Sequence, residues 1–360
     1  MRKALIGTAK GLVVLTINGY PQLHSIHFKG FSITMVHADE RIGRWWCGVS
    51  HKHWGQKLHY SDDCGISWKE ARVPNFGDVK LANGQPAKLR QLWCMAHANE
   101  DRPGELWLGT DPGGLFHSTD NGESFSLVHT LWDHPSRSDP MKWFGAGSDY
   151  PFIHSIVVDP NDSDRVYIAV SCAGVFETVD GGKTWEARNR GLIAAYLPNP
   201  HVEIGHDPHM LLQHPAETNV LWQQNHCGVF LSKDYGATWN DVSGEGGMPN
   251  YGFAIAIDDR QPGSAWVIPV ESDEERVAPD LKLEVYQTHD FGRHWESVSE
   301  GLPEAPAFDI VLRHAFVKNG DFMLFGTTNG NIYYSRGKNI HWKIFTANLT
   351  KVNTVIIAEN

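Results

Sequence analysis

The stretch "TVDGGKTW", Thr178–Trp185, is one copy of a short pattern that recurs along the chain. The pattern reads Ser or Thr, any residue, Asp, any residue, Gly, two further residues and an aromatic. Two copies precede it, "SDDCGISW" from Ser61 and "STDNGESF" from Ser118, and two follow it, "SKDYGATW" from Ser232 and "THDFGRHW" from Thr288. A weaker sixth copy is "SRGKNIHW" from Ser335. The central residues lie 57, 60, 54 and 56 residues apart and are Asp63, Asp120, Asp180, Asp234 and Asp290. A period of this length indicates a fold assembled from copies of one unit.

The residue types of this pattern are those of a turn. A carboxylate two residues before a Gly can accept backbone N–H bonds across the turn, while the Gly adopts a positive φ. The aromatic residue that follows can pack between neighbouring sheets. We therefore interpret Asp180 as a structural residue and expect the chemistry elsewhere.

Each copy is preceded by an apolar strand, a short Gly-containing turn and a second strand. Examples are "LWLGTDPGGLFHS" from Leu106, "VYIAVSCAGVFET" from Val166 and "LWQQNHCGVFLS" from Leu221. The segments "ALIGTAKGLVVL" from Ala4 and "MLFGTTNGNIYYS" from Met323 match this strand–turn–strand pattern and raise the number of units to seven. One more apolar run precedes most units, which gives four short strands in each. Four-stranded units of about 45 to 60 residues are typical of β-propeller blades.

The first unit lacks the extra apolar run, and the chain ends with one, "VNTVIIAEN" from Val352. Residues 352–358 are therefore expected to pair with residues 3–7, which would cover the edges of a cut ring. The sequence thus predicts an all-β fold. It is a seven-bladed β-propeller of four-stranded antiparallel blades, closed by the C-terminal strand pairing with the N-terminal blade, with residues 1–360 as a single domain.

The repeats resemble the Asp-box, or BNR, repeat of the sialidase superfamily and of related propellers. These include xyloglucan-hydrolysing glycosidases, sortilin-type receptors and a photosystem assembly factor. The segments "PGGLFHSTDNG" (112–122) and "GHDPHM" (205–210) are also similar to bacterial Asp-box proteins that are usually labelled glycosyl hydrolases or exo-sialidases. The resemblance implies the propeller fold, which serves enzymes, receptors and assembly factors alike.

Two features of these families are missing. Sialidases carry an aromatic-Arg-Ile-Pro motif in the first blade, whereas the Arg-Ile pair of this chain, at Arg41, has no Pro after it. True sialidase activity is therefore not expected. The xyloglucan-hydrolysing enzymes use two propellers, and this chain has repeats for one.

Composition narrows the range of partners. The 31 basic and 42 acidic side chains give a net charge of -11, and no run of Lys or Arg reverses it, so nucleic acid and anionic membranes are not expected partners. No apolar run approaches the length needed to cross a membrane. The apolar stretch near the N-terminus is interrupted at Gly7, Thr8, Lys10 and Gly11, so we expect a cytoplasmic protein rather than a secreted one.

Histidines gather in the loops that should open onto one end of the channel. The segment "HVEIGHDPHM" (201–210) enters one inner strand, and "QQNHCG" (223–228) is the turn between the next two strands. We expect catalytic acid–base roles for His154, His206, His226 and Glu203. A divalent metal (Mn, Zn or Ca) is expected on His206, His209, His226 and Gln224, as in propeller-type oligogalacturonate lyases. The same histidines could instead act without metal, or simply donate to loop carbonyls.

Residues for substrate binding are expected on the same end of the molecule. The long insertion 131–155 carries aromatic residues and an Arg, which suit stacking on a sugar and gripping a carboxylate, although a self-packed loop would use them too. The candidates are Arg137, Arg313, Trp54, Trp132, His134 and Asn225.

These observations favour a carbohydrate-active enzyme, a hydrolase or a lyase, working on a small-molecule or oligosaccharide substrate at the mouth of the channel. The alternative is a non-catalytic propeller that binds a glycan or a protein partner.

Overall fold

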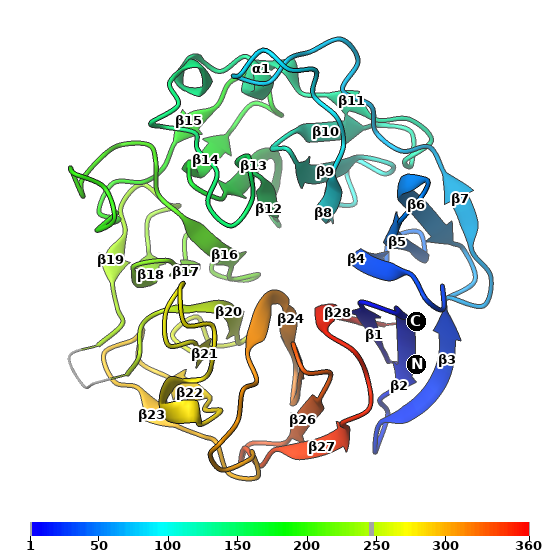
Figure 1. The fold of residues 1–360 in the computed structure, drawn as a ribbon, viewed down its shortest axis with the longest axis vertical. Coiled ribbons are helices and arrows are strands. Elements are labelled where there is room, and N and C mark those ends of the chain that lie inside the picture. The colour runs from blue at the N-terminus through cyan, green and yellow to red at the C-terminus, as the bar shows by residue number, and fades with distance from the viewer. Residues whose placement is uncertain (1, 245–247, 360) are drawn as a thin grey trace.

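The computed structural model describes residues 2–244 and 248–359 and is nearly all β (Figure 1). Its sheets are arranged in a ring, with the first strand of each four-stranded sheet toward the centre. Within the described residues there are five four-stranded antiparallel sheets and one eight-stranded sheet. No helix in this part of the chain is long and apolar enough to span a membrane.

The four-stranded sheets follow one another along the chain. The first two contain β4 (Ser32–Asp39), β5 (Arg44–His51), β6 (Gly55–Ser61) and β7 (Lys69–Ala71), then β8 (Gln91–His97), β9 (Leu106–Asp111), β10 (Leu115–Ser118) and β11 (Ser126–Leu127). The third contains β12 (Ile153–Asp159), β13 (Asp162–Val170), β14 (Gly174–Thr178) and β15 (Glu186–Ala187). The last two contain β16 (Pro208–Gln213), β17 (Leu221–Asn225), β18 (Gly228–Ser232) and β19 (Asn240–Asp241), then β20 (Gly252–Ile257), β21 (Ala265–Pro269), β22 (Tyr286–Thr288) and β23 (Glu296–Ser297).

The eight-stranded sheet joins the two ends of the chain. It contains β24 (Val311–Asn319), β25 (Phe322–Thr327), β26 (Ile332–Arg336) and β27 (Lys343–Thr346), then β28 (Val352–Ala358), β1 (Lys3–Thr8), β2 (Gly11–Thr16) and β3 (Gln22–His27). β28 pairs with β1 antiparallel from Lys3↔Ala358 to Thr8↔Val352, so the strand pairing expected between residues 352–358 and 3–7 is present. β24 and β28 meet in parallel at His314↔Thr354. The short helices α1 (His129–Trp132), η1 (Pro135–Ser138) and η2 (Pro279–Leu281) lie in connections.

The repeated pattern forms the turn between the third and fourth strands of a sheet. Asp180 accepts from Thr178 Oγ1 at 2.7 Å, from Thr184 N at 2.9 Å and from Thr184 Oγ1 at 2.7 Å. These donors, the Thr184 hydroxyl first, lower the pKa of Asp180 to about 2. Gly182 has a φ of 87° and lies against Trp107 of the preceding sheet. Apolar clusters fill the spaces between neighbouring sheets, so each turn also fixes a sheet against its neighbour.

A register shift recurs near the start of the inner strands. One residue is left unpaired at Thr34 in β4, Trp93 in β8, His154 in β12, His209 in β16, Phe253 in β20 and Asn353 in β28. In β24 the register breaks between Val311 and Phe316, a span that contains Arg313. Bulges of this kind redirect a side chain, and here they occur at equivalent places around the axis of the ring.

Candidate active site

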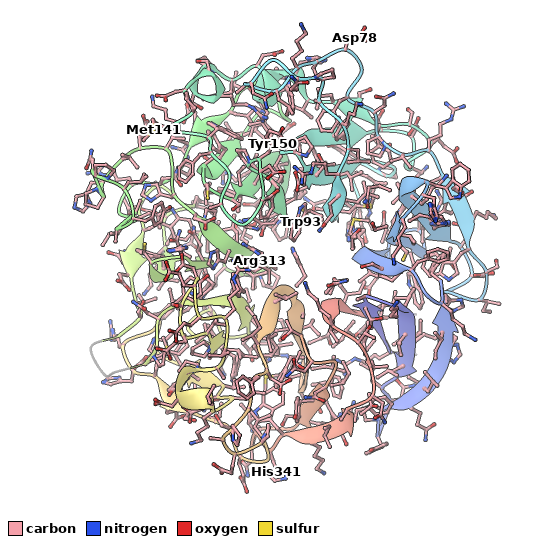
Figure 2. The ribbon with its side chains drawn as sticks, in the orientation of Figure 1. Asp78, Trp93, Met141, Tyr150, Arg313 and His341 are labelled. Carbon is pink, nitrogen blue, oxygen red and sulfur yellow. The ribbon has the colours of Figure 1, made fainter. Side chains whose placement is uncertain are left out.

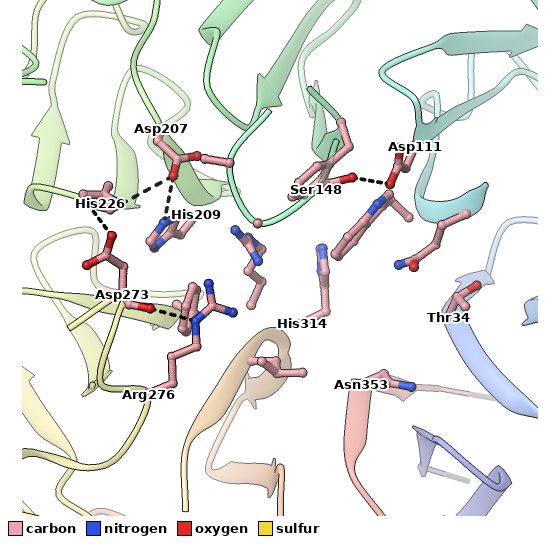
Figure 3. A pocket seen from close by; sticks show the side chains of 18 of the residues that line it. Thr34, Asp111, Ser148, Asp207, His209, His226, Asp273, Arg276, His314 and Asn353 are labelled. Atoms are coloured by element: carbon pink, nitrogen blue, oxygen red, sulfur yellow. Dashed lines mark hydrogen bonds and ion pairs between the residues drawn. The ribbon is translucent and has the colours of Figure 1, made fainter. Parts of the chain in front are cut away.

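The bulged residues line a cavity of about 820 Å³ at one end of the ring axis, which we call the axial cavity (Figure 3). Its wall includes five of them together with Arg313, and His154 lies fully buried beside it. The remaining wall comes from the loops that enter the inner strands or leave the second strands. Charged groups on the wall are Arg90, Asp111, Asp149, Asp207, Asp273, Arg276, Arg313 and Lys351.

Asp207 is the centre of a buried polar cluster on this wall. Its Oδ1 accepts from Ser171 Oγ at 2.8 Å and from the Cys172 amide at 3.2 Å. Its Oδ2 lies 3.3 Å from His209 Nε2 and 3.5 Å from His226 Nδ1 (Figure 3). Burial opposes ionisation, but His209, His226 and Arg313 together hold the pKa of Asp207 well below its usual range. Asp207 is therefore a carboxylate.

The tautomer of His209 follows from its other nitrogen. Nδ1 lies 2.5 Å from the Gly252 carbonyl oxygen, which can only accept, so Nδ1 carries a proton. Burial, opposed by Asp207, lowers the pKa of His209 and favours the neutral ring. In the neutral ring Nε2 has no proton, and its lone pair faces the carboxylate. A cation or an added proton between the two atoms would relieve this conflict.

The cluster also fits a divalent metal ion. One atom from each of Asp207, His209 and His226 can be chosen so that all three lie within 4.8 Å of one another. Two imidazoles and a carboxylate are a common donor set for Mn, Zn and related ions. The bond from His209 Nδ1 to a carbonyl is the outer contact that usually fixes a metal-binding histidine.

Asp111 lies at the end of β9, across the axial cavity from Asp207 (Figure 3). Its Oδ2 accepts from Ser148 Oγ at 2.8 Å, and its buried Oδ1 has no partner among the described residues. Burial raises the pKa of Asp111 above its ordinary value of 3.8. The cavity thus holds two carboxyl groups in opposite environments.

The structure brings together only part of the residue set expected from the sequence. His209, His226 and Arg313 line the axial cavity. His206 and Glu203 do not line it: His206 Nε2 lies 2.7 Å from the Val202 carbonyl oxygen, and the Glu203 side chain is exposed.

The two amide candidates have structural contacts. Gln224 donates through Nε2 to the carbonyl oxygens of Asn225, Gly228 and Asn250. Asn225 donates to Gln223 Oε1 and accepts from the Cys227 amide. Both side chains therefore brace the β17–β18 turn and its neighbour, and the carboxylate of Asp207 takes the place in the cluster that the sequence assigned to His206 or Gln224.

The insertion candidates lie around a second cavity of about 550 Å³. The Arg137 guanidinium is stacked 4.3 Å from the Trp132 ring and 4.4 Å from the Trp143 ring, and its Nη1 donates to the Gly113 carbonyl oxygen. His134 Nδ1 lies 2.7 Å from Ser136 Oγ. These contacts hold the insertion together. Trp54 is 74% exposed and lines a separate hollow of about 350 Å³ beside His51.

Comparison with known proteins gives distant relatives of one kind. No family model matches the chain. It is 26% identical over 216 residues to an oligoxyloglucan-reducing-end-specific xyloglucanase of Emericella nidulans, which covers 56% of this chain and 25% of the relative. It is 24% identical over 271 residues to a xyloglucanase of Acetivibrio thermocellus, which covers 69% and 30%. The chain therefore spans less than a third of the length of these relatives.

Solved structures show the fold. A GH74 xyloglucanase from Xanthomonas campestris superposes with a TM-score of 0.64 at 15% identity, over 94% of this chain and 52% of that one. YCF48 from Cyanidioschyzon merolae gives 0.56 at 12% identity, over 91% and 94%. The nearly all-β, propeller-like architecture is thus shared with proteins of different names.

Proposed function

We propose that the chain is a glycoside hydrolase that binds an oligosaccharide in the axial cavity. One observation carries the proposal: Asp111 and Asp207 line the same cavity, one as a desolvated acid and the other as a hydrogen-bonded carboxylate. Carboxyl groups whose environments push their protonation states apart are the usual acid and base of glycoside hydrolysis. The distant xyloglucanase relatives support the same reaction class.

In this proposal the two residues have separate roles. Asp111 donates a proton to the glycosidic oxygen of the leaving group, because its Oδ1 faces no other group of the described chain. Asp207 accepts a proton from the attacking water through Oδ2, since Oδ1 is already engaged by Ser171 and Cys172. His226, which is partly exposed beside Asp207, orients that water.

The test is turnover of a panel of glycosides and oligosaccharides, xyloglucan fragments included. We expect Asp111→Asn and Asp207→Asn to lower kcat about 10²- to 10⁴-fold with little change in KM. Asp62→Asn, which removes a carboxylate from the Arg44 ion pair outside the cavity, is the control and should keep full activity. If no member of the panel is cleaved but sugars bind, the chain is a non-catalytic glycan-binding propeller and the proposal is wrong.

The donor set of Asp207, His209 and His226 favours a second candidate, a metal-assisted lyase. When bound there, a divalent ion (Mn, Zn or Ca) would supply positive charge that polarises an acidic sugar. His209 Nε2, His226 Nδ1 and Asp207 Oδ2 would hold it. We would then expect stoichiometric metal by elemental analysis and a rise in thermal midpoint on adding the ion, both lost in His209→Ala and kept in His51→Ala. Metal-free protein with no response to any of the three ions would contradict this candidate.

We also propose that the eight-stranded sheet is two blades, which makes the molecule a closed, seven-bladed ring and a single domain. The support is the single parallel contact between β24 and β28, the antiparallel pairing of β28 with β1, and the recurrence of the bulge in both halves. The hydrogen bonds that Asp180 and its counterparts accept in these turns support the proposal that the units are Asp-box repeats.

A further inference from the structure

Arg313 lines the axial cavity. It lies in β24, where the register breaks, and its guanidinium points toward the centre of the ring (Figure 2). Three aromatic rings surround the guanidinium carbon, with centroids at 5.1 Å for Phe253, 5.4 Å for Phe152 and 5.9 Å for Trp93. The cation is thus packed against three aromatic rings.

This cation forms no ion pair within 4.0 Å with a carboxylate of the described chain, and Asp207 acts on it only from a longer distance. Its buried Nε has no hydrogen-bond partner. The nearby carboxylate of Asp207 lies 3.3 Å from His209 Nε2 and 3.5 Å from His226 Nδ1 and forms no ion pair with Arg313 within 4.0 Å. Arg276, also on the wall, uses its Nε on the Asp273 carbonyl oxygen and adds positive charge to the same side. Arg313 is partly exposed to the cavity, so its guanidinium can reach a ligand, and a charge packed against apolar surfaces without a partner is costly.

We propose that the missing counter-ion is the carboxylate of the substrate, so that the oligosaccharide contains a uronic acid. This rests on the proposed function, because it assumes that the axial cavity binds sugar. The planar fork of Arg313 suits a carboxylate held by two parallel hydrogen bonds. Trp93 lines the cavity and is stacked on Phe152 at 4.6 Å and 11°, which gives a flat surface beside the guanidinium for the sugar ring. A neutral glycan would leave the guanidinium unpaired.

The test measures binding apart from catalysis. Calorimetric titrations use Asp111→Asn protein, so that no substrate is consumed, with trigalacturonate and the matched neutral galactose trimer as probes. We expect the acidic trimer to bind at least about 10-fold more tightly, and Arg313→Gln to reduce this preference to less than about 3-fold. Arg313→Lys keeps the charge without the fork and should give an intermediate preference. Arg293→Gln, an exposed arginine outside the cavity, is the control and should change nothing.

Each outcome decides the matter. Equal affinity for both trimers overturns the inference, and so does a preference that survives in well-folded Arg313→Gln protein. A melting curve of each variant checks that it is folded. If the Arg313→Gln variant does not fold, the preference measured for Arg313→Lys decides the question. Inorganic phosphate or sulfate that binds as tightly as trigalacturonate also overturns it, since the site would then take a free anion. Tight uronate binding by the Asp111→Asn protein, without turnover by the unmodified protein, supports the inference and contradicts hydrolysis. Cleavage of neutral glycans by the unmodified protein with no uronate preference does the reverse.

Discussion

At the scale of single residues, the axial cavity gives two aspartates opposite properties. Asp207 is 6% exposed and Asp111 is 7% exposed, so burial alone does not distinguish them. The difference lies in their partners, because Asp207 has two hydrogen-bond donors and two imidazoles, whereas Asp111 has one hydroxyl. Desolvation without compensation is what raises a carboxyl pKa.

This difference predicts the effect of pH on stability. The pKa of Asp111 is higher in the folded chain than in the unfolded one, so its stabilising contribution is complete below its ordinary value of 3.8 and is lost as pH rises through the folded value. Above the folded value, the ionised residue therefore destabilises the fold. We expect Asp111→Asn to raise the thermal midpoint at pH 7 by about 2 °C, which corresponds to roughly 1 kcal/mol for a large domain. Melting curves between pH 3 and pH 8 should show this gain vanishing toward the acid end.

Asp62 is the control with the opposite sign. Burial opposes its ionisation, but the Arg44 and Lys69 partners lower its pKa, so its contribution is present above its ordinary value and is lost as pH falls. Asp62→Asn should lower the midpoint at pH 7, by less than 2 °C because the Asp62 carboxylate is exposed to solvent. A gain for Asp111→Asn that stays constant across the pH range would contradict the explanation.

The sequence could not predict which loop side chains point into the axial cavity. Residues 207 and 209 point into the axial cavity, and residue 206 points away, as alternation along an extended segment requires. The density of histidines in "HVEIGHDPHM" correctly located the loop, but without knowing the phase of this alternation it favoured His206 over Asp207. Asp111 was missed because it looks like an ordinary strand end until the contact with Ser148 from the insertion is seen.

At the scale of elements, the inner strands could have revealed more than they did. Aligned at their bulges, "ITM", "LWC", "IHS", "PHM", "GFA", "LRH" and "VNT" place Thr34, Trp93, His154, His209, Phe253, Arg313 and Asn353 at one position. Structural repeats vary most where they carry function, and this position changes in chemical type almost from unit to unit. The outer turns behave in the opposite way, since each repeats the same hydrogen bonds.

The sequence left open whether the insertion 131–155 is a self-packed loop or part of the site, and the structure gives contacts of both kinds. Arg137 between Trp132 and Trp143 holds the insertion as a self-packed loop. The far end of the same loop carries Ser148, which donates to Asp111, and Asp149, which pairs with Arg90 on the cavity wall. Its aromatic residues therefore act on the site through the position of the loop.

At the scale of the whole molecule, the strand order was predictable because the periodic turns mark each unit and the leftover strand marks the ends. The placement of side chains on the axis was not predictable, because it depends on bulges that interrupt the simple alternation of a strand.

The same architecture leads to a prediction about the stability of the ring. β28 supplies the inner partner of β1, and Asn353 donates from it to the Ile33 carbonyl oxygen of the next sheet.

Removing residues 352–360 should therefore abolish cooperative unfolding. Without β28, the edge of β1 and its buried residues from Ala4 to Ile6 become exposed, as does the side of β24 that meets β28. We expect the truncated chain to aggregate or to melt without a defined transition in calorimetry. Moving residues 350–358 in front of residue 2 through a two-residue turn should restore folding, because Lys3 and Ala358 are paired and the two strands would then form a hairpin. A truncated chain that melts as sharply and at as high a temperature as the full chain would show that the ring does not depend on β28. Recovery of cooperative unfolding in the permuted chain would show that the loss came from the missing strand pairing rather than from the cut itself.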